Sequence, residues 1–434
     1  MSLLRPRSIA QELASASARG VCLGLGLVTL ATGVWAEEGE DGFAVTAAKA
    51  LVCELSGRQV VEDAVILVRG DTIEAVGTRA EVAIPEGYEV HDAGDSWVMP
   101  GMVDLHSHVG GLRGYNDMVF QVNGGLRVSA TVRPGNARLE RPVAAGITTI
   151  LYIPGSGTNV GGQGILMKTK DGTFEEVLVR NPGSLKIAQG DNPKRWGYRM
   201  ERGLMNHHIR YALRQGKAYA ERWEAFEKGE GPRPERRLNL DVFRDLLANE
   251  ISISTHTQYY QVVLSTLRIL RQEFGFPTFI DHGSFDSWKL GPLAQEIGVP
   301  AILGPREVLF HRSFRFDTDG AVHGCAWGFQ KEGVELIGFN TDAPVVPQEE
   351  LPLQAAMGVR YGFDDRGMGS VRGLTIVPAV VAGIGDRLGS LEVGKQADLV
   401  VLTGDPSDPR TIVERVWIDG ELEYDVEKEA RRKW

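Results

Sequence analysis

Short apolar runs alternate with helical segments through the middle of the chain, residues 99–388. Stretches such as Val262–Phe274 and Pro292–Ile297 have helical character and lie between several runs of strand length. Eight short strands in strand–helix alternation are typical of a parallel sheet closed into a barrel, so we predict a (β/α)₈ TIM-type barrel. The predicted strands are Gly101–His106, Thr148–Ile153, Ile165–Lys168, Leu185–Ala188, Ile251–His256, Phe276–His282, Pro300–Gly304 and Leu336–Asn340.

Two β-rich segments, residues 44–98 and 389–425, flank this region. In each of them short apolar runs are separated by Gly and Asp turn signals, which is the pattern of strands and tight turns. We predict that both chain ends build one small composite β-sandwich domain. Residues 200–250 are helical and charged, with Arg210–Lys228 at the centre, and are interpreted as an excursion on the barrel. The β strands predicted at the ends include Val65–Val68, Ile73–Val76, Asp398–Leu402 and Val413–Ile418.

Residues 1–36 differ from the rest of the chain. Three arginines precede an apolar run over Val21–Val34, and small residues lie at Val34 and Ala36. This order is typical of a secretory signal peptide, and the run is shorter than the roughly 20 residues of a membrane span. We predict export to the periplasm or the extracellular space, with no membrane span in the mature chain. An N-terminal anchor or a buried helix is the alternative.

The composition is that of an ordinary globular protein. Of 434 residues, 43% are hydrophobic and 24% are charged. The net charge is −10, and loss of residues 1–36, which hold three Arg and one Glu, would take it to −12. Nucleic acid and acidic membrane surfaces are therefore poor candidates as partners, and a small-molecule substrate is expected. The mature chain would keep two cysteines, Cys53 and Cys325, which allow one disulfide.

Polar residues recur at the C-terminal ends of the predicted barrel strands, where barrels assemble their active sites. His106 and His108 lie at the end of the first strand. His256 and His282 end the fifth and the sixth, and Asp342 follows the eighth. Two histidines at i and i+2 on one strand point to the same face, so His106 and His108 can bind one ion together. Imidazole and carboxylate groups suit zinc and similar divalent metals, so the sequence predicts a divalent metal centre, with zinc expected.

Three segments resemble the amidohydrolase superfamily. The segment Val98–His108, VMPGMVDLHSH, is similar to the opening signature of that family. The segment Gly389–Val401, GSLEVGKQADLVV, resembles the return of the chain into the family's β domain, and Asn340–Pro344, NTDAP, is similar to its eighth-strand Asp. The likeness covers residues 44–425 and is strongest for the imidazolonepropionase-like and dihydroorotase-like branches. It implies a metal-dependent hydrolase.

The resemblance also implies roles for the polar residues. Asp342 would take a proton from water and pass it to the leaving group. A divalent ion lowers the pKa of bound water and polarises a carbonyl group. His256 and His282 would be metal ligands, or one of them would contact the substrate if one ion is bound. The alternative for Asp342 is a structural carboxylate in the turn that follows the eighth strand.

Lys186 lies where many binuclear members of the family carry a carboxylated lysine that bridges two ions. Its neighbours Leu185 and Ile187 are apolar, and a bare ammonium is costly to bury on a barrel strand. Carboxylation would turn this lysine into an anionic ligand. A mononuclear centre, or Lys168 in the same role, is the alternative.

Loop residues are candidates for substrate contact. The Gly-rich run Pro154–Gly164 holds Asn159 and Gln163 but lacks the lysine of a phosphate-binding loop, so we interpret it as an active-site loop. Arg306 follows the seventh strand and can present a cation to a substrate carboxylate. A solvated loop is the alternative for Arg306.

Together these observations predict an enzyme that hydrolyses a C–N bond in an amide, a dipeptide, an N-acyl amino acid or a cyclic amide, using one or two divalent ions. Deamination or hydrolysis of a ring C–N bond is the alternative on the same fold. A noncatalytic scaffold or assembly protein is the alternative from another class. Such relatives typically lose metal ligands, whereas this chain retains the His and Asp set. Barrels of this kind commonly associate, so a homo-oligomer is compatible with the sequence.

Overall fold

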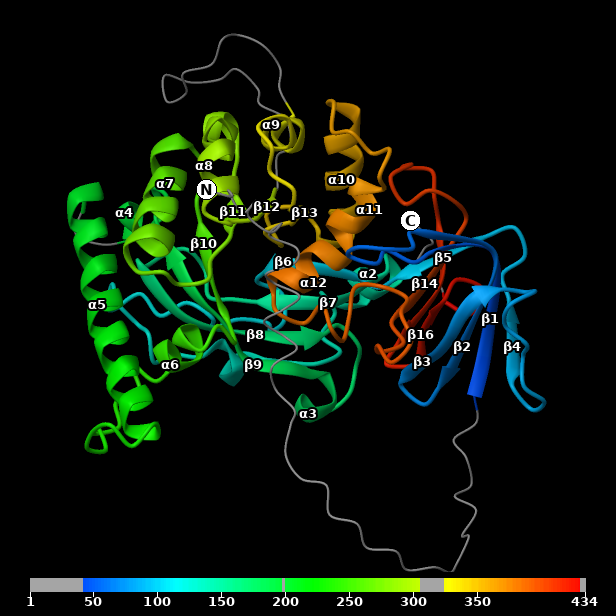
Figure 1. The fold of residues 1–434 in the computed structure, drawn as a ribbon, viewed down its shortest axis with the longest axis horizontal. Helices are drawn as coiled ribbons and strands as arrows, with labels where there is room; N and C mark the ends of the chain where they lie inside the picture. Colours follow the sequence, from blue (N-terminus) through cyan, green and yellow to red (C-terminus); the bar gives the residue numbers. More distant parts are fainter. Residues whose placement is uncertain (1–41, 197–199, 305–323, 430–434) are drawn as a thin grey trace, which may run out of the picture.

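The structure of the protein, a computed structural model, describes residues 42–196, 200–304 and 324–429. A β-rich unit that contains both ends of the described chain (blue and red) lies beside a larger α/β region (Figure 1). The predicted signal segment 1–36 and Arg306 lie outside the described residues. Within the described ranges, no helix has both the length and the apolar character needed to cross a membrane.

Strands from both chain ends join in one sheet. The hydrogen-bonded order is β16-β15-β14-β5-β1-β2-β3, with β4 beside β1. The antiparallel pairing of β14 with β5 connects the two ends, as predicted. All eight strands belong to one hydrogen-bonded sheet, because β1 pairs with both β4 and β5. The sandwich stays a prediction. These strands are β1 (Gly42–Leu51), β2 (Val60–Arg69), β3 (Thr72–Thr78), β4 (Glu89–Asp92), β5 (Trp97–Pro100), β14 (Leu399–Leu402), β15 (Val413–Ile418) and β16 (Glu421–Asp425).

Strand β2 explains the continuous apolar run in this part of the sequence. Ile66 and Val68 pack into one hydrophobic cluster, whereas Val65 and Leu67 pack into another on the opposite face. Because successive side chains of a strand point to opposite faces, a strand covered on both faces has to be apolar at every position. The hairpin from β2 to β3 turns at Gly70, whose φ of +56° is a left-handed conformation that glycine adopts without steric cost.

The central region contains all eight predicted barrel strands. They pair in the order β10-β9-β8-β7-β6 in one sheet and β11-β12-β13 in another. Single bridges connect the two sheets, from Ile253 to Thr278, from Thr257 to His282, and from Ser107 to Ala343. The pairing around the ring is therefore interrupted at two points. The strands are β6 (Met102–Ser107), β7 (Ile147–Tyr152), β8 (Val160–Lys168), β9 (Leu178–Ala188), β10 (Ser252–His256), β11 (Ile280–His282), β12 (Ala301–Leu303) and β13 (Ile337–Phe339).

The prediction that all eight strands are parallel is wrong for β8. This strand runs antiparallel to both β7 and β9. The reason is the short connection over residues 153–159, which contains no helix. Parallel neighbours need a crossover of about a dozen residues or more, so a loop of this length can only join antiparallel strands.

Helices lie between the strands and beside them. The predicted helix Val262–Phe274 is present as α7 followed by a π-helical segment, and Pro292–Ile297 falls on α8. The helices are α2 (Glu140–Ala144), α3 (Phe174–Val177), α4 (Asn192–Trp196), α5 (Arg202–Glu227), α6 (Val242–Leu247), α7 (Tyr260–Ser265), α8 (Gly291–Glu296), α9 (Cys325–Lys331), α10 (Leu351–Arg360), α11 (Gly369–Leu374) and α12 (Ile376–Val381). The short segments are η1 (Val128–Thr131), η2 (Thr266–Glu273), η3 (Phe285–Leu290) and η4 (Gln348–Glu350).

Helix α5 is the predicted charged excursion. It buries one stripe of small and apolar residues at helical spacing, which includes Ile209, Leu213 and Tyr219, and leaves its charged face to solvent. Gly216 allows α6 to approach closely, because a Cβ atom there would lie 2.2 Å from the ring of Phe243. This helix therefore packs against the outside of the β9–β10 edge through a core of its own.

Candidate metal centre

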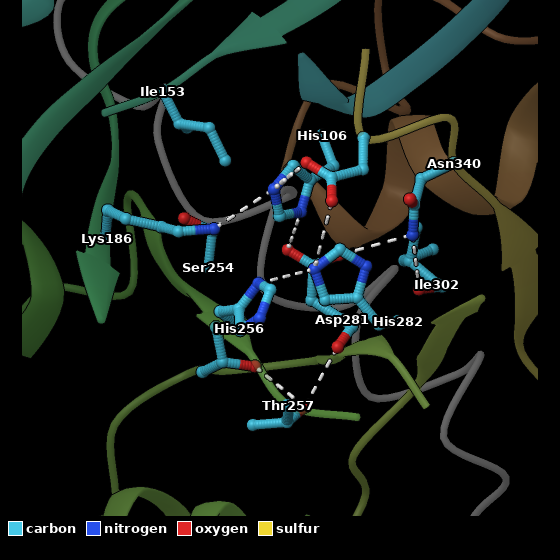
Figure 2. Close-up of polar contacts among 12 residues, drawn as sticks. His106, Ile153, Lys186, Ser254, His256, Thr257, Asp281, His282, Ile302 and Asn340 are labelled. Carbon is cyan, nitrogen blue, oxygen red and sulfur yellow. Dashed lines mark hydrogen bonds and ion pairs between the residues drawn. The ribbon is translucent and has the colours of Figure 1, made fainter. Parts of the chain in front are cut away.

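Six residues singled out from the sequence converge in one buried cluster. They lie on β6, β9, β10 and β11 and in the turn after β13, at the carboxyl ends of the parallel strands and of β9. Figure 2 shows four of them, His106, Lys186, His256 and His282, pointing toward one another from different strands. All six are less than 9% exposed: His106, His108, Lys186, His256, His282 and Asp342.

The carboxylate of Asp342 lies between the histidines. Its Oδ1 is 3.2 Å from Nε2 of His106 and 3.3 Å from Nε2 of His108. Its Oδ2 is 3.9 Å from Nε2 of His282, which in turn lies 2.8 Å from Nδ1 of His256. Asp342 thus belongs to two groups of donor atoms, and within each group all the donor atoms lie within 4.8 Å of one another. One group adds His106 of β6 and His108 just beyond it, and the other adds the histidines of β10 and β11.

Three imidazole rings are held from outside the cluster through Nδ1. Nδ1 of His106 lies 2.7 Å from Oδ2 of Asp281. Nδ1 of His108 lies 2.8 Å from the carbonyl oxygen of Ile153, and Nδ1 of His282 lies 2.7 Å from the carbonyl oxygen of Gly304. Carbonyl and carboxylate oxygens accept hydrogen bonds, so Nδ1 carries the proton and donates it. The lone pair of Nε2 then faces the cluster, which is the tautomer that binds a metal.

His256 is oriented the other way. Its Nδ1 faces His282, and its buried Nε2 has no hydrogen-bond partner among the residues that the structure describes. It therefore offers Nδ1 to the cluster instead of Nε2.

Burial and neighbouring charges set the protonation states. Burial lowers the pKa of His108 and His256, and it lowers that of His282 to about 4. Burial alone would raise the pKa of Asp342, but the positive charge of His106 and the close contacts with His106 and His108 hold it well below its usual range. At neutral pH these groups are thus neutral imidazoles around an ionised carboxylate.

His106 and Lys186 depart from their usual pKa in opposite directions. Burial opposes the charged form of His106, but the charges of Asp281 and Asp342 outweigh it and raise the pKa to about 8. Burial lowers the pKa of Lys186 to about 8, against the partial compensation of the same two carboxylates. The Lys186 Nζ atom lies 3.2 Å from Nε2 of His106. The cluster therefore attracts positive charge at His106 and disfavours a buried ammonium at Lys186.

Lys168, the alternative for the lysine of the centre, lies elsewhere. Its Nζ is 2.7 Å from Oδ1 of Asp398 and 2.9 Å from Oδ1 of Asp419, in a buried ion-pair group between β8 and the composite sheet. The structure places Lys186, not Lys168, among the histidines.

The residues predicted to contact substrate from an active-site loop are not part of the cluster, and Gln163 lies within β8 rather than in a loop. Asn159 is buried, and its Nδ2 donates to the carbonyl oxygen of Ala188. Gln163 is also buried, and its Nε2 donates to the carbonyl oxygen of Gly124. Within the described ranges neither side chain hydrogen-bonds to a member of the cluster. Their contact with substrate stays a prediction, as does that of Arg306.

Sequence reasoning missed two fully buried carboxylates beside the histidines. Asp281 precedes His282, and Asp104 lies two residues before His106. Asp104 accepts hydrogen bonds from Oγ1 of Thr341 at 2.5 Å and from Nε2 of Gln348 at 3.1 Å. Burial raises the pKa of Asp104 to about 6, although the bond from Thr341 opposes this. A signal was available, because a charged residue inside an apolar strand is almost never buried without a partner.

These residues fit a divalent cation. Imidazole nitrogens and a carboxylate are the donor set that zinc and related metals prefer. Donor atoms of His108 and Asp342 lie within 4.8 Å of one another in one group, and those of His256, His282 and Asp342 do so in a second group. The raised pKa of His106 shows that the carboxylates of Asp281 and Asp342 favour a positive charge at this place.

Known proteins resemble this chain over most of its length. Residues 328–423 match the model of the Amidohydrolase family. An amidohydrolase of known structure from Thermotoga maritima is 31% identical, and the match covers 88% of this chain and 100% of that one with a TM-score of 0.77.

Two curated relatives are more distant. Amidohydrolase tasK from Hapsidospora irregularis is 25% identical over 398 residues, which are 83% of this chain but 40% of that protein. The chain thus spans less than half the length of that relative. An imidazolonepropionase from Pseudomonas putida is 23% identical over 372 residues, covering 78% of this chain and 87% of the relative.

Proposed function

The chain belongs to the amidohydrolase superfamily, and from this premise we propose that it hydrolyses a C–N bond at a divalent-metal centre. The substrate class is an amide, a dipeptide, an N-acyl amino acid or a cyclic amide. The observation that carries the proposal is the ionised carboxylate of Asp342 within 3.3 Å of Nε2 of both His106 and His108, in a buried cluster.

The four histidines and Asp342 would hold the metal. His106, His108 and His282 offer Nε2, and His256 offers Nδ1. A divalent ion, with zinc as the first candidate, would supply Lewis acidity toward a carbonyl and lower the pKa of bound water.

Asp342 is the proposed general base. The carboxylate accepts a proton from the attacking water as the C–O bond forms, and it then donates that proton to the nitrogen as the C–N bond breaks. Its depressed pKa keeps the carboxylate ionised, and thus able to accept a proton, at neutral pH. The neighbouring Nε2 atoms of His106 and His108 fix its position.

Lys186 is proposed to be carboxylated and to hold a second ion. The neutral amine attacks the carbon of CO₂, a C–N bond forms, and the amine loses one proton to give a carbamate anion. Lys186 is fully buried, its amine lies beside His106, and its pKa of about 8 leaves a reactive neutral fraction near neutral pH. An anion at this place removes the cost of burying an ammonium.

Metal analysis combined with a substrate screen tests the proposal. The purified protein is expected to hold zinc or a related metal, and a variant with His106→Ala and His108→Ala is expected to lose it. The variant His207→Ala, at an exposed position of α5 outside the cluster, serves as the control and is expected to keep its metal. Unchanged metal content in the double variant would overturn the ligand assignment.

The screen uses dipeptides, N-acyl amino acids and cyclic amides with the metal-loaded protein. Release of an amine or opening of a ring, lost on metal removal, is the expected result. Release of ammonia would instead indicate a deaminase. A stable metal centre without turnover on any of these classes would favour the scaffold alternative.

We also propose that the protein is exported. This rests on the order of basic, apolar and small residues in segment 1–36.

A further inference from the structure

A buried carboxylate, Asp281, links three strands behind the candidate metal centre. We infer that Asp281 is a positioning residue that fixes the ring and the tautomer of His106, and that it does so from outside the metal's own ligand set. The inference rests on the proposed function, because it assigns His106 to the metal. Figure 2 shows Asp281 of β11 between His106 of β6 and Asn340, which follows β13.

Both oxygens of Asp281 are engaged. Oδ2 lies 2.7 Å from Nδ1 of His106, and Oδ1 accepts a hydrogen bond of 3.2 Å from Nδ2 of Asn340. Asn340 is itself held, because its Nδ2 also donates to the carbonyl oxygen of Ile302. None of these side chains is exposed to solvent, so water does not compete for the bonds.

The backbone of His282 makes this arrangement possible. Neighbouring residues of a regular strand point to opposite faces, so Asp281 and His282 could not both reach His106 from an extended strand. His282 has a φ of +76°, a left-handed conformation that breaks the alternation. Donor atoms of His106, Asp281 and His282 consequently lie within 4.8 Å of one another.

The chemistry follows from which atom carries the proton. A carboxylate can only accept, so it forces the proton of His106 onto Nδ1 and leaves the Nε2 lone pair for a cation. In an Asp281→Asn variant, Asn340 still needs an acceptor, so the new amide keeps its oxygen toward Asn340. Its NH₂ group then faces Nδ1 of His106, which must become the acceptor. The proton moves to Nε2, where it blocks metal binding.

Zinc affinity, measured by competition with a chelator, tests the inference. Asp281→Asn is expected to bind Zn²⁺ about 10–100-fold more weakly than the wild type, the usual effect of removing a partner of a ligand. The decisive comparison adds the same change to a His106→Ala background. If Asp281 acts through His106, it produces no further loss there. Additive losses would show that Asp281 binds the metal itself or acts elsewhere, and would overturn the inference.

The control variant is Asp398→Asn, which has the same chemical change at another buried aspartate, in the ion-pair group with Lys168. It is expected to lower the unfolding temperature but to leave the zinc affinity of the folded protein unchanged. An equal loss of affinity in this control would mean that Asp281→Asn acts through general destabilisation, which also overturns the inference.

A second measurement does not depend on the metal. In ¹⁵N-histidine-labelled, metal-free protein, the inference predicts a downfield proton on Nδ1 of His106 that is lost in both His106→Ala and Asp281→Asn. Its retention in Asp281→Asn would contradict the inference. If the wild type showed this proton but bound no Zn²⁺, the proposed function would fail while the role of Asp281 in orienting His106 would stand.

Discussion

Two fully buried lysines on neighbouring strands should respond in opposite ways to the same substitution. Lys168 of β8 lies 2.7 Å and 2.9 Å from the two oxygens of Asp398, and Asp419 is a second counter-charge. Lys186 of β9 lies 3.2 Å from an imidazole nitrogen and, within the described ranges, has no carboxylate at ion-pair distance. Methionine matches the apolar part of lysine in length and removes the charge, so Lys→Met isolates the electrostatic contribution.

The two substitutions are expected to change the stability of the folded protein in opposite directions. In Lys168→Met the buried carboxylate of Asp398 loses its cation, and breaking a buried ion pair in this way costs about 3–5 kcal/mol. The partly exposed Asp419 keeps Lys170 at 3.4 Å. For Lys186, a pKa lowered from 10.5 to about 8 corresponds to about 3 kcal/mol that the ammonium costs the folded, metal-free protein. Because the folded pKa lies below the unfolded one, this cost is full below about pH 8 and disappears above about pH 10.5. Lys186→Met should therefore stabilise the metal-free protein at pH 7 by up to about 3 kcal/mol.

Urea unfolding of metal-free protein at pH 7 and pH 10 measures both effects. At pH 7, Lys168→Met should unfold at a lower urea concentration than the wild type, and Lys186→Met at the same or a higher one. The advantage of Lys186→Met should shrink at pH 10. A cost below about 1 kcal/mol for Lys168→Met would refute the stabilising role of its ion pairs. Equal destabilisation by both substitutions would refute the argument that the charge of Lys186 is incompletely compensated.

Three further predictions concern the centre and the chain start. Asp342→Asn should keep at least part of the metal but lower kcat about 10²–10⁴-fold, since an amide cannot serve as the base; near-normal kcat on an established substrate would contradict its role. Zinc loading of metal-free protein should accelerate with added bicarbonate and with rising pH, with a midpoint near 8, because neutral Lys186 reacts with CO₂. A loading rate that ignores CO₂ would count against the carbamate. N-terminal sequencing of native protein should find Glu37 near the start, whereas an intact Met1 in a cytoplasmic fraction would refute export.

The strand pattern and the positions of the ligands could be predicted because they follow from local sequence. Each predicted barrel strand is a short, mainly apolar run, and every predicted ligand except Lys186 lies at or just beyond the end of such a run. The direction of β8 was mispredicted for a local reason as well. The loop before it is rich in glycine, but its length permits only a reversal of the chain direction.

The surroundings of the ligands could not be predicted, because they depend on strands that are distant in the sequence. Asp281 and His106 are separated by 175 positions, and Thr341 and Asp104 by 237. A sequence identifies which residues need a partner, but it does not identify the partner. The choice between Lys168 and Lys186 is a case in point, since both lie among apolar neighbours and only the position of Asp398 separates them.

Backbone strain supplies an argument for function that is independent of the ligand chemistry. His282 and Asp342 both hold a left-handed backbone, with φ of +76° and +50°. Such a conformation costs a residue other than glycine about 1–2 kcal/mol, so glycine at either place would relieve it. The chain instead has side chains at both positions, and hydrogen bonds hold the strained segments in place. Nδ1 of His282 is bonded to the carbonyl oxygen of Gly304, and the backbone N–H of Ala343 donates to Oγ1 of Thr341. His282 and Asp342 are both strained, and each presents a donor atom to the same cluster. Stability alone does not readily explain this. They are expected if the position of those atoms is what the protein requires.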